Sequence, residues 1–302
     1  MPCNLCEADD PRPRLQARDT LLGGSEVFTL VECRECGLVY LNPRPTQEAI
    51  GVYYHSRYFD AVGTGAVRSC WMRFLLDRLG RLAGQIEELP PGTVLDVGCG
   101  QGAYLKFFQQ RGWAVWGIDP SPLAVERARR RGLRAFQGEM ESVPLPESAF
   151  DLVLMRYTIE NMHDPAGALR QVRRVLRPRG KLFLAAPAID APLVRWLGEF
   201  SAYVDAPRHL YFFTAETLTR MLERAGFRVL AWASVPWLGV FHDVVARRAR
   251  GRLRAWVRGK LSGRLLWGAC LPASLALAVI GLNRGNIELI AEKLGTEAGA
   301  RV

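Results

Sequence analysis

The chain has 302 residues, of which 49% are hydrophobic and 23% charged, and its formal net charge is +10 at pH 7. This length and composition are those of one large globular domain or of a core domain with appendages. The positive charge would suit nucleic acid, but eight basic residues and no acid lie within 247–264, and subtracting these eight from +10 leaves +2. The charge therefore belongs to one segment, and nucleic-acid binding is the less favoured interpretation.

Two C-x-x-C pairs lie near the start of the chain, Cys3 with Cys6 and Cys33 with Cys36. Each pair can form a turn that points two thiolates at one ion, and four thiolates complete the tetrahedral coordination that zinc prefers. Such a site leaves no open position, so the sequence predicts structural Zn2+ rather than a catalytic ion. The arrangement favours metal and reduced thiols over disulfides, and hence a cytoplasmic protein. Two unrelated reduced pairs are the alternative.

The segment between the pairs contains an apolar run, Val27–Val31, which predicts a hairpin strand of a zinc ribbon. Beyond the second pair, residues 37–46 are typical of a strand that stops at two prolines, and Thr46 can cap a following helix. An amphipathic helix over Trp71–Leu89 then leads to a linker with two prolines. The helix after Thr46 would carry Tyr53 and Tyr54 and, beyond a break, Tyr58 and Phe59.

Val94–Gly102 reads V-L-D-V-G-C-G-Q-G, an apolar run with an acid near its end followed by alternating glycines. The pattern predicts a buried parallel strand that turns sharply into a helix, where a ligand can approach the backbone closely. About 20 residues later a second apolar run ends in Asp119, at the position where a βαβ nucleotide site holds a ribose diol.

Strands and helices alternate downstream and predict a doubly wound parallel α/β sheet. A sharp turn is expected at Pro178–Gly180, before the fifth strand. Helices are expected at Pro122–Arg131, Pro165–Leu176 and Glu216–Gly226. Strands are expected at Thr93–Val97, Trp113–Ile118, Arg134–Gln137, Asp151–Arg156, Lys181–Ala186 and Phe227–Ala233, with an antiparallel last strand at Gly285–Lys293.

Three motifs together resemble class I S-adenosylmethionine (SAM)-dependent methyltransferases: D-V-G-C-G-Q-G at 96–102, G-E-M-E-S-V-P-L-P at 138–146 and A-F-D-L-V-L-M at 149–155. The resemblance covers roughly residues 93–227. It implies a Rossmann-like sheet of seven strands, the last of them antiparallel. A degenerate or NAD-binding Rossmann domain is the alternative, because glycine-rich turns are shared with dinucleotide enzymes.

The resemblance also implies a SAM site along the carboxyl edge of this sheet. Asp96 would lie under the methionine moiety, and Asp119 would accept hydrogen bonds from both ribose hydroxyls. Glu139 stands where the family places an acid that reads the adenine amino group, with a solvated loop acid as the alternative. The other members of the predicted cofactor site are Gly98, Gly100, Gly102, Pro120, Met140 and Arg156.

The four cysteines, C-G-L-V-Y-L-N-P-R-P at 36–45 and P-R-H-L-Y-F-F at 207–213 together resemble a bacterial methyltransferase subfamily. Its members belong to cell-surface polysaccharide, glycolipid and secondary-metabolite pathways, and by this resemblance the aromatic helix covers the SAM pocket as a lid. The tyrosines would serve equally well to pack the ribbon on the core. His209 would take a proton from an acceptor hydroxyl, since imidazole titrates near neutral pH, or would instead hold its loop. Relatives commonly have histidine where this chain has Asn161, so no base is inferred there.

Residues 235–284 form an insertion that joins the basic run to nineteen uncharged residues, Leu265–Asn283. This length is near the roughly 20 residues that span a bilayer, but a single span would separate the last strand from its sheet. Pro272 and Gly281 predict a broken helix. The insertion is therefore either a buried apolar cap, hairpin or dimer face, or a peripheral contact of residues 247–283 with an anionic membrane surface.

The sequence thus predicts a zinc ribbon at 1–45, a helical lid and linker at 46–90, a SAM-dependent methyltransferase core at 91–234 and 285–295, and the insertion at 235–284. The predicted reaction is O-methylation of a sugar or glycolipid-type acceptor, either a small molecule or a lipid-linked saccharide. Methylation of another soluble small molecule is one alternative, and a nucleic-acid-binding module with a non-catalytic Rossmann domain is the other. The residues after Met1 predict no secretory leader, so we expect a cytoplasmic protein, free or held peripherally at the inner face of the membrane.

Overall fold

The structure, a computed structural model, describes residues 1–54, 81–236, 240–249, 253, 256–257, 260–282 and 284–295. The predicted aromatic residues Tyr58 and Phe59, and residues 71–80 of the predicted helix Trp71–Leu89, lie outside this part of the chain. The chain divides into two compact units. The first comprises Met1–Leu76, Pro187–Thr214 and Ser234–Ile287, and the second comprises Asp77–Ala186, Ala215–Ala233 and Glu288–Val302.

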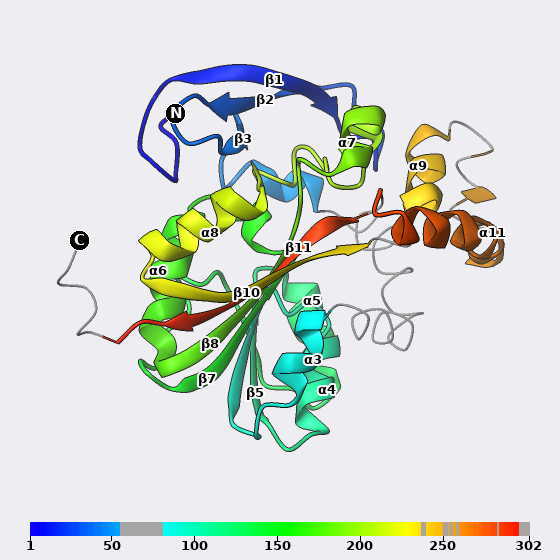
Figure 1. The fold of residues 1–302 in the computed structure, drawn as a ribbon. Coiled ribbons are helices and arrows are strands. Elements are labelled where there is room, and N and C mark those ends of the chain that lie inside the picture. The colour runs from blue at the N-terminus through cyan, green and yellow to red at the C-terminus, as the bar shows by residue number, and fades with distance from the viewer. Residues whose placement is uncertain are drawn as a thin grey trace. The chain divides into compact units, whose positions relative to one another are not determined.

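A seven-stranded sheet in the order β10-β11-β8-β7-β4-β5-β6 dominates the second unit (Figure 1). β4 pairs in parallel with both β5 and β7, whereas β11 runs antiparallel to its neighbours. The predicted Rossmann-like sheet with its antiparallel last strand is therefore confirmed. Its strands are β4 (Thr93–Val97), β5 (Ala114–Asp119), β6 (Ala135–Gln137), β7 (Phe150–Arg156), β8 (Leu176–Pro187), β10 (Phe227–Pro236) and β11 (Arg284–Lys293).

Helices cover both faces of this sheet, with α3, α4 and α5 on one face and α6 and α8 on the other (Figure 1). Two of them begin at the residues that the sequence predicts, Pro122 and Pro165, and in each a capping side chain precedes the proline. Ser121 Oγ accepts the Ala124 N–H at 3.3 Å, and Asp164 Oδ1 accepts the Gly167 N–H at 2.9 Å. The helices are α3 (Arg81–Glu87), α4 (Ala103–Gln109), α5 (Pro122–Arg130), α6 (Pro165–Val175) and α8 (Ala215–Arg224).

The apolar strand runs form the core because helices bury both faces of the sheet. Val94, Leu152 and Phe183, from three adjacent strands, are fully buried and belong to one cluster. Burial on both faces explains why these strands read as continuous apolar runs rather than as alternating patterns.

The fifth strand begins earlier than predicted. β8 starts at Leu176, and the expected turn Pro178–Gly180 lies inside the strand as an irregularity in its register with β7. Arg179 has a φ of +63°, and a Cβ atom at Gly180 would lie 2.9 Å from the carbonyl oxygen of Arg177. The three residues therefore form a bulge, with pairing to β7 on both sides.

The first unit contains a second sheet, in the order β1-β2-β3-β9. β1 (Pro11–Arg18) and β2 (Val27–Cys33) form an antiparallel hairpin, and β3 (Val39–Leu41) extends it. The outer strand β9 (Tyr211–Phe212) comes from the stretch that the sequence assigned to a loop, and it pairs antiparallel with β3. Two residues carry no detectable periodicity, so only pairing with a distant segment defines this strand.

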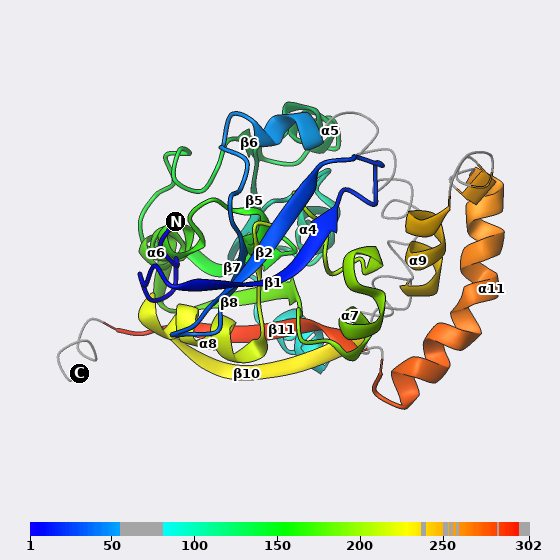
Figure 2. The ribbon, with the colours of Figure 1, turned by 90° about the horizontal axis from the view of Figure 1, so that it is seen from above.

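The helices in the described part of the first unit are η1 (Ile50–Tyr53), α7 (Pro192–Leu197), η3 (Gly198–Phe200), α9 (Val240–Arg248) and α11 (Lys260–Val279). α9 and α11 lie side by side (Figure 2). α11 continues through Pro272, where a break was expected, and ends before Gly281, which has a φ of +79°. Among the described residues, no helix combines the length and hydropathy needed to cross a bilayer.

A buried group of four charges holds distant segments of the first unit together. Arg208 is 1% exposed and donates hydrogen bonds from Nη1 and Nη2 to the carboxylate of Asp19, both at 2.8 Å. Its Nε and Nη2 donate to Asp205 at 2.8 and 3.0 Å. From α9, Arg247 donates to Asp205 at 3.0 Å and to the hydroxyl of Thr20 at 2.9 Å. The two aspartates and two arginines together carry no net charge, and buried charges need such oppositely charged partners.

Burial alone would raise the pKa of Asp205, but Arg208 and Arg247 outweigh burial and hold this pKa well below its usual value. A depressed folded-state pKa contributes stability at pH values above the unfolded pKa of about 4. That contribution is lost progressively as the pH falls below about 4.

Replacing Arg208 by Met should lower the free energy of unfolding by about 3–5 kcal/mol, because Asp19 and Asp205 would stay buried with too few partners. Urea unfolding followed by circular dichroism measures this loss. The control is Arg130→Ala, which removes an exposed ion pair with Glu126 on α5 and should cost about 0–1 kcal/mol. Equal losses in the two variants would contradict the assigned role of Arg208.

Candidate functional site

The glycine turn after β4 uses backbone conformations that favour glycine. Gly98, Gly100 and Gly102 have φ angles of +75°, +53° and +78°. The N–H groups of Gly98 and Cys99 both donate to the carbonyl of Ile118, at 2.8 and 3.0 Å, which ties the turn to the end of β5. The turn thus lies at the carboxyl edge of the parallel strands, where the sequence predicts a ligand.

The three glycines differ in what surrounds them. A Cβ atom at Gly98 would lie 2.4 Å from the hydroxyl of Thr158, and one at Gly102 would lie 2.3 Å from Leu133. A Cβ atom at Gly100 would meet nothing within 4 Å. Packing against protein atoms therefore requires glycine at the first and third positions, while the middle glycine faces open space that a ligand can occupy.

Asp119, at the end of β5, is bonded directly to this turn. Its Oδ2 accepts the N–H of Gly100 at 2.8 Å, and its Oδ1 accepts the N–H of Ser121 at 2.9 Å. Burial raises the pKa of Asp119, and the two backbone N–H groups oppose that rise. Each carboxylate oxygen has a second lone pair, so the group can still accept hydrogen bonds from a diol.

Asp96 lies inside the end of β4 and is buried. Burial raises its pKa to about 7, against the opposing charge of Arg156, with Asp119 adding to the rise. The guanidinium of Arg156, at the end of β7, lies 4.0 Å from the ring centre of Tyr104 on α4. The predicted site residues of β4, β5 and β7 therefore share one edge of the sheet.

The next predicted site residues follow β6. Glu139 is exposed and Met140 buried, and the N–H of Gly138 donates to the carbonyl of Asp119 at 3.1 Å. This bond places the Gly138–Met140 turn beside the acid at the end of β5. Pro120, which follows that acid, is exposed.

Thr158 and Glu160, which follow β7, were not among the predicted site residues. Thr158 Oγ1 lies 3.0 Å from the carbonyl oxygen of Val97 and packs against the glycine turn. Glu160, in η2 (Ile159–Asn161), is 1% exposed, and burial raises its pKa to about 8. Neither of its carboxyl oxygens has a hydrogen-bond partner among the described residues. No sequence motif separates a buried acid of this kind from a surface one.

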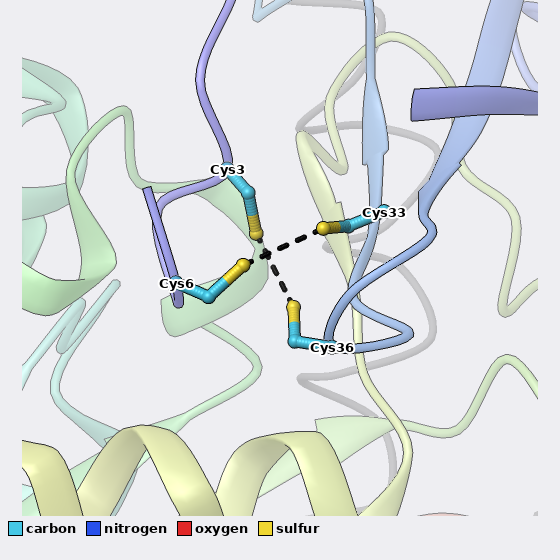
Figure 3. A group of neighbouring side chains, drawn as sticks. All are labelled: Cys3, Cys6, Cys33 and Cys36. Carbon is cyan, nitrogen blue, oxygen red and sulfur yellow. Dashed lines mark hydrogen bonds between the residues drawn. The ribbon is translucent and has the colours of Figure 1, made fainter. Parts of the chain in front are cut away.

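The four N-terminal cysteines converge on one point (Figure 3). Their Sγ atoms all lie within 4.8 Å of one another, with Cys3 and Cys36 at 3.4 Å and Cys6 and Cys33 at 3.5 Å. Tetrahedral zinc with bonds of about 2.3 Å places sulfur atoms about 3.8 Å apart. Gly37, with a φ of +77°, follows the second pair and lets the chain turn back over it.

His209 lies next to the buried charges of the first unit. Its Nδ1 is 3.2 Å from the carbonyl oxygen of Tyr203. A carbonyl can only accept, so Nδ1 carries the proton and Nε2 keeps a lone pair. Burial lowers the pKa of His209 against the charge of Asp205, so the ring is neutral at pH 7.

Comparison with known proteins places this geometry in a family. The family model described as "Methyltransferase domain" matches residues 68–231, more than half of the chain. Malonyl-(acyl-carrier protein) O-methyltransferase of Serratia marcescens is 32% identical over 142 residues, which cover 46% of this chain and 55% of that protein. Demethylmenaquinone methyltransferase of Corynebacterium kroppenstedtii is 25% identical over 209 residues, covering 60% and 88%.

Among solved structures, the (4+2)-cyclase SpnF is similar with a TM-score of 0.50 and 27% identity, over 72% of this chain and 81% of that one. The chain spans about half the length of the first curated relatives that it matches. A cyclase among the similar structures shows that this fold supports more than one reaction. The family match and the seven-stranded sheet agree, and the chain belongs to the methyltransferase domain family.

Proposed function

We propose that this chain transfers a methyl group from SAM to a hydroxyl of a sugar or glycolipid-type acceptor. The observation that carries the proposal is the bond between the Asp119 carboxylate and the Gly100 N–H at 2.8 Å. This hydrogen bond joins Asp119, the last residue of β5, to Gly100, the glycine of the turn at which a Cβ atom would meet no protein atom within 4 Å. Family membership supports methyl transfer over a dinucleotide reaction.

The residues present fit SAM. Asp119 would accept hydrogen bonds from the ribose hydroxyls, and Gly100 leaves room for the ligand at the turn. Asp96 and Arg156 would orient the methionine part, whose amino group is a cation that relieves the cost of an ionised Asp96. Glu139 and Met140 would hold the adenine, the first with its carboxylate and the second as an apolar wall. SAM supplies an activated methyl group on a sulfonium, and the protein mainly aligns it with the acceptor.

Asp119→Asn should weaken SAM binding by about 10- to 100-fold, because it removes charge-assisted hydrogen bonds to the ribose. It also places an amide donor against the N–H of Gly100 or Ser121. Isothermal titration calorimetry with SAM measures the change. The control is Asp151→Asn at the amino end of β7, where the side chain accepts the Thr93 N–H at 2.8 Å and does not reach the ligand edge. A folded wild-type chain that takes up no SAM would refute the proposal.

The acceptor class rests on the subfamily resemblance of the N-terminal segment and of residues 207–213. The two curated relatives act, by their names, on malonyl-(acyl-carrier protein) and on demethylmenaquinone, so acceptors differ among relatives. A hydroxyl acceptor must lose a proton as its oxygen takes the methyl group. His209 has the protonation state that a general base needs, since the ring is neutral with its proton on Nδ1 and a lone pair on Nε2.

Incubation with methyl-labelled SAM and either lipid-linked saccharides or soluble sugars should yield label that survives mild alkali, as a methyl ether does and a methyl ester does not. The rate should rise with pH and then reach a plateau. The midpoint of the rise should lie below about pH 6.5, since burial lowers the pKa of His209. His209→Gln should remove this limb and slow transfer about 100-fold without changing SAM affinity. His163→Gln is the matched control. Alkali-labile label would point to a carboxyl acceptor instead.

The four cysteines are proposed to hold a structural Zn2+. The convergence of their Sγ atoms supports this, and backbone N–H groups support it further. Burial raises the pKa of the Cys3 thiol, while the N–H groups of Cys6 and Leu5 point at its sulfur and oppose the rise. Sulfurs that receive N–H groups are prepared for the thiolate form that zinc binds.

Mass spectrometry of the purified chain should find about one zinc ion, and a chelator should lower the melting temperature. Cys36→Ser should lose the metal, because three thiolates leave an open position in the coordination sphere. Cys270→Ser, on α11, should keep both metal and melting temperature. Full zinc content in Cys36→Ser would rule out a four-cysteine site.

A further inference from the structure

Helix α11 exposes a continuous apolar face. Leu265 and Leu275 on α11 and Ile280 directly after its end are 63%, 44% and 64% exposed. The positions between them on the same face are exposed small or apolar residues, namely Gly268, Ala269, Pro272, Ala273 and Ala276. From residue 265 to residue 280 the face is about 22 Å long at 1.5 Å per residue. A patch of this kind is the signature of an interaction site.

The opposite side of α11 packs against α9. Ser274, the only hydroxyl residue between 265 and 282, is buried on the packed side. The exposed face consequently offers water no hydrogen-bonding or charged side chain. The exposed face of an ordinary surface helix carries polar or charged side chains. The exposed face of α11 carries none, which indicates that it contacts something other than water.

The insertion is strongly basic. Residues 235–284 contain nine Lys and Arg residues and one acid, Asp243 on α9. Two of the nine have structural roles: Arg247 joins the buried charges, and the Arg248 guanidinium lies 4.8 Å from the ring centre of Phe200. In the basic run, Leu253 and Trp256 are also exposed. Tryptophan and basic residues in the sequence next to an apolar helix are typical of segments that lie in the membrane interface.

We propose that the insertion binds an anionic bilayer surface, with α11 lying in the interface and its Leu265–Ile280 face toward the acyl chains. A second copy of the chain fits less well, because two insertions that each carry nine basic residues and a single acid would repel each other. Anionic lipid headgroups complement the charge, and each basic residue near such a surface strengthens binding about fivefold. Binding of the insertion to a bilayer does not depend on which acceptor is methylated.

Co-sedimentation of the full-length protein with vesicles tests the proposal. Phosphatidylcholine vesicles should bind it at least about tenfold less than vesicles of phosphatidylcholine and phosphatidylglycerol, and high salt should release it. Leu275→Glu should reduce binding to the anionic vesicles about tenfold or more. Leu230→Glu, on β10 and 43% exposed, is the matched control and should leave binding unchanged.

Absence of binding to anionic vesicles would overturn the proposal. So would equal losses in the two Leu→Glu variants. Sedimentation velocity without vesicles adds an independent readout: a dimer that Leu275→Glu dissociates would make a second copy the occupant of this face. Since Leu275 is partly exposed and outside the SAM and cysteine residues, circular dichroism and SAM affinity should match the wild type.

Discussion

The first unit depends on ion pairs between charged side chains that are buried inside it. Arg208 is almost inaccessible to water, and it is tolerated there because four short hydrogen bonds connect it to Asp19 and Asp205. These residues belong to the turn after β1 and to the segment before β9, and Arg247 adds α9. A hairpin, a loop and a helix from distant parts of the sequence are thus held by one electrostatic group, which also fixes the backbone beside His209.

In the described part of the second unit, the acids Asp96 and Asp119 are not held by ion pairs of this kind. Burial raises the pKa of Asp96 to about 7 against the opposing charge of Arg156. Asp119 accepts hydrogen bonds from the N–H of Gly100 in the glycine turn and from the N–H of Ser121. Charge is therefore under-compensated along the carboxyl edge of the sheet. A cationic ligand with a diol would supply what is missing, which is why the edge suits SAM in the proposed reaction.

Much of the second unit could be predicted because its signals are local. The apolar runs and the glycine turn each specify their own structure, so the core strands and the sharp turn after β4 could be predicted, and with them the sheet edge to which Asp96, Asp119 and Arg156 belong. The bulge at Pro178–Gly180 and the continuous helix through Pro272 were missed, since pairing with β7 and packing against α9 override local preference. Glu160 was not singled out as a site residue because burial is invisible in a single sequence.

The sequence by itself determined the sheet of the family, the four cysteines and the basic segment, because spacing and composition record them directly. Tertiary structure decided which distant residues meet: β9 with β3, Arg208 with Asp19, and the exposed side of α11. These depend on contacts between segments up to about 190 residues apart, whose pairing no local period encodes. The physical reason is that burial and charge compensation are properties of neighbours in space, not of neighbours in the chain.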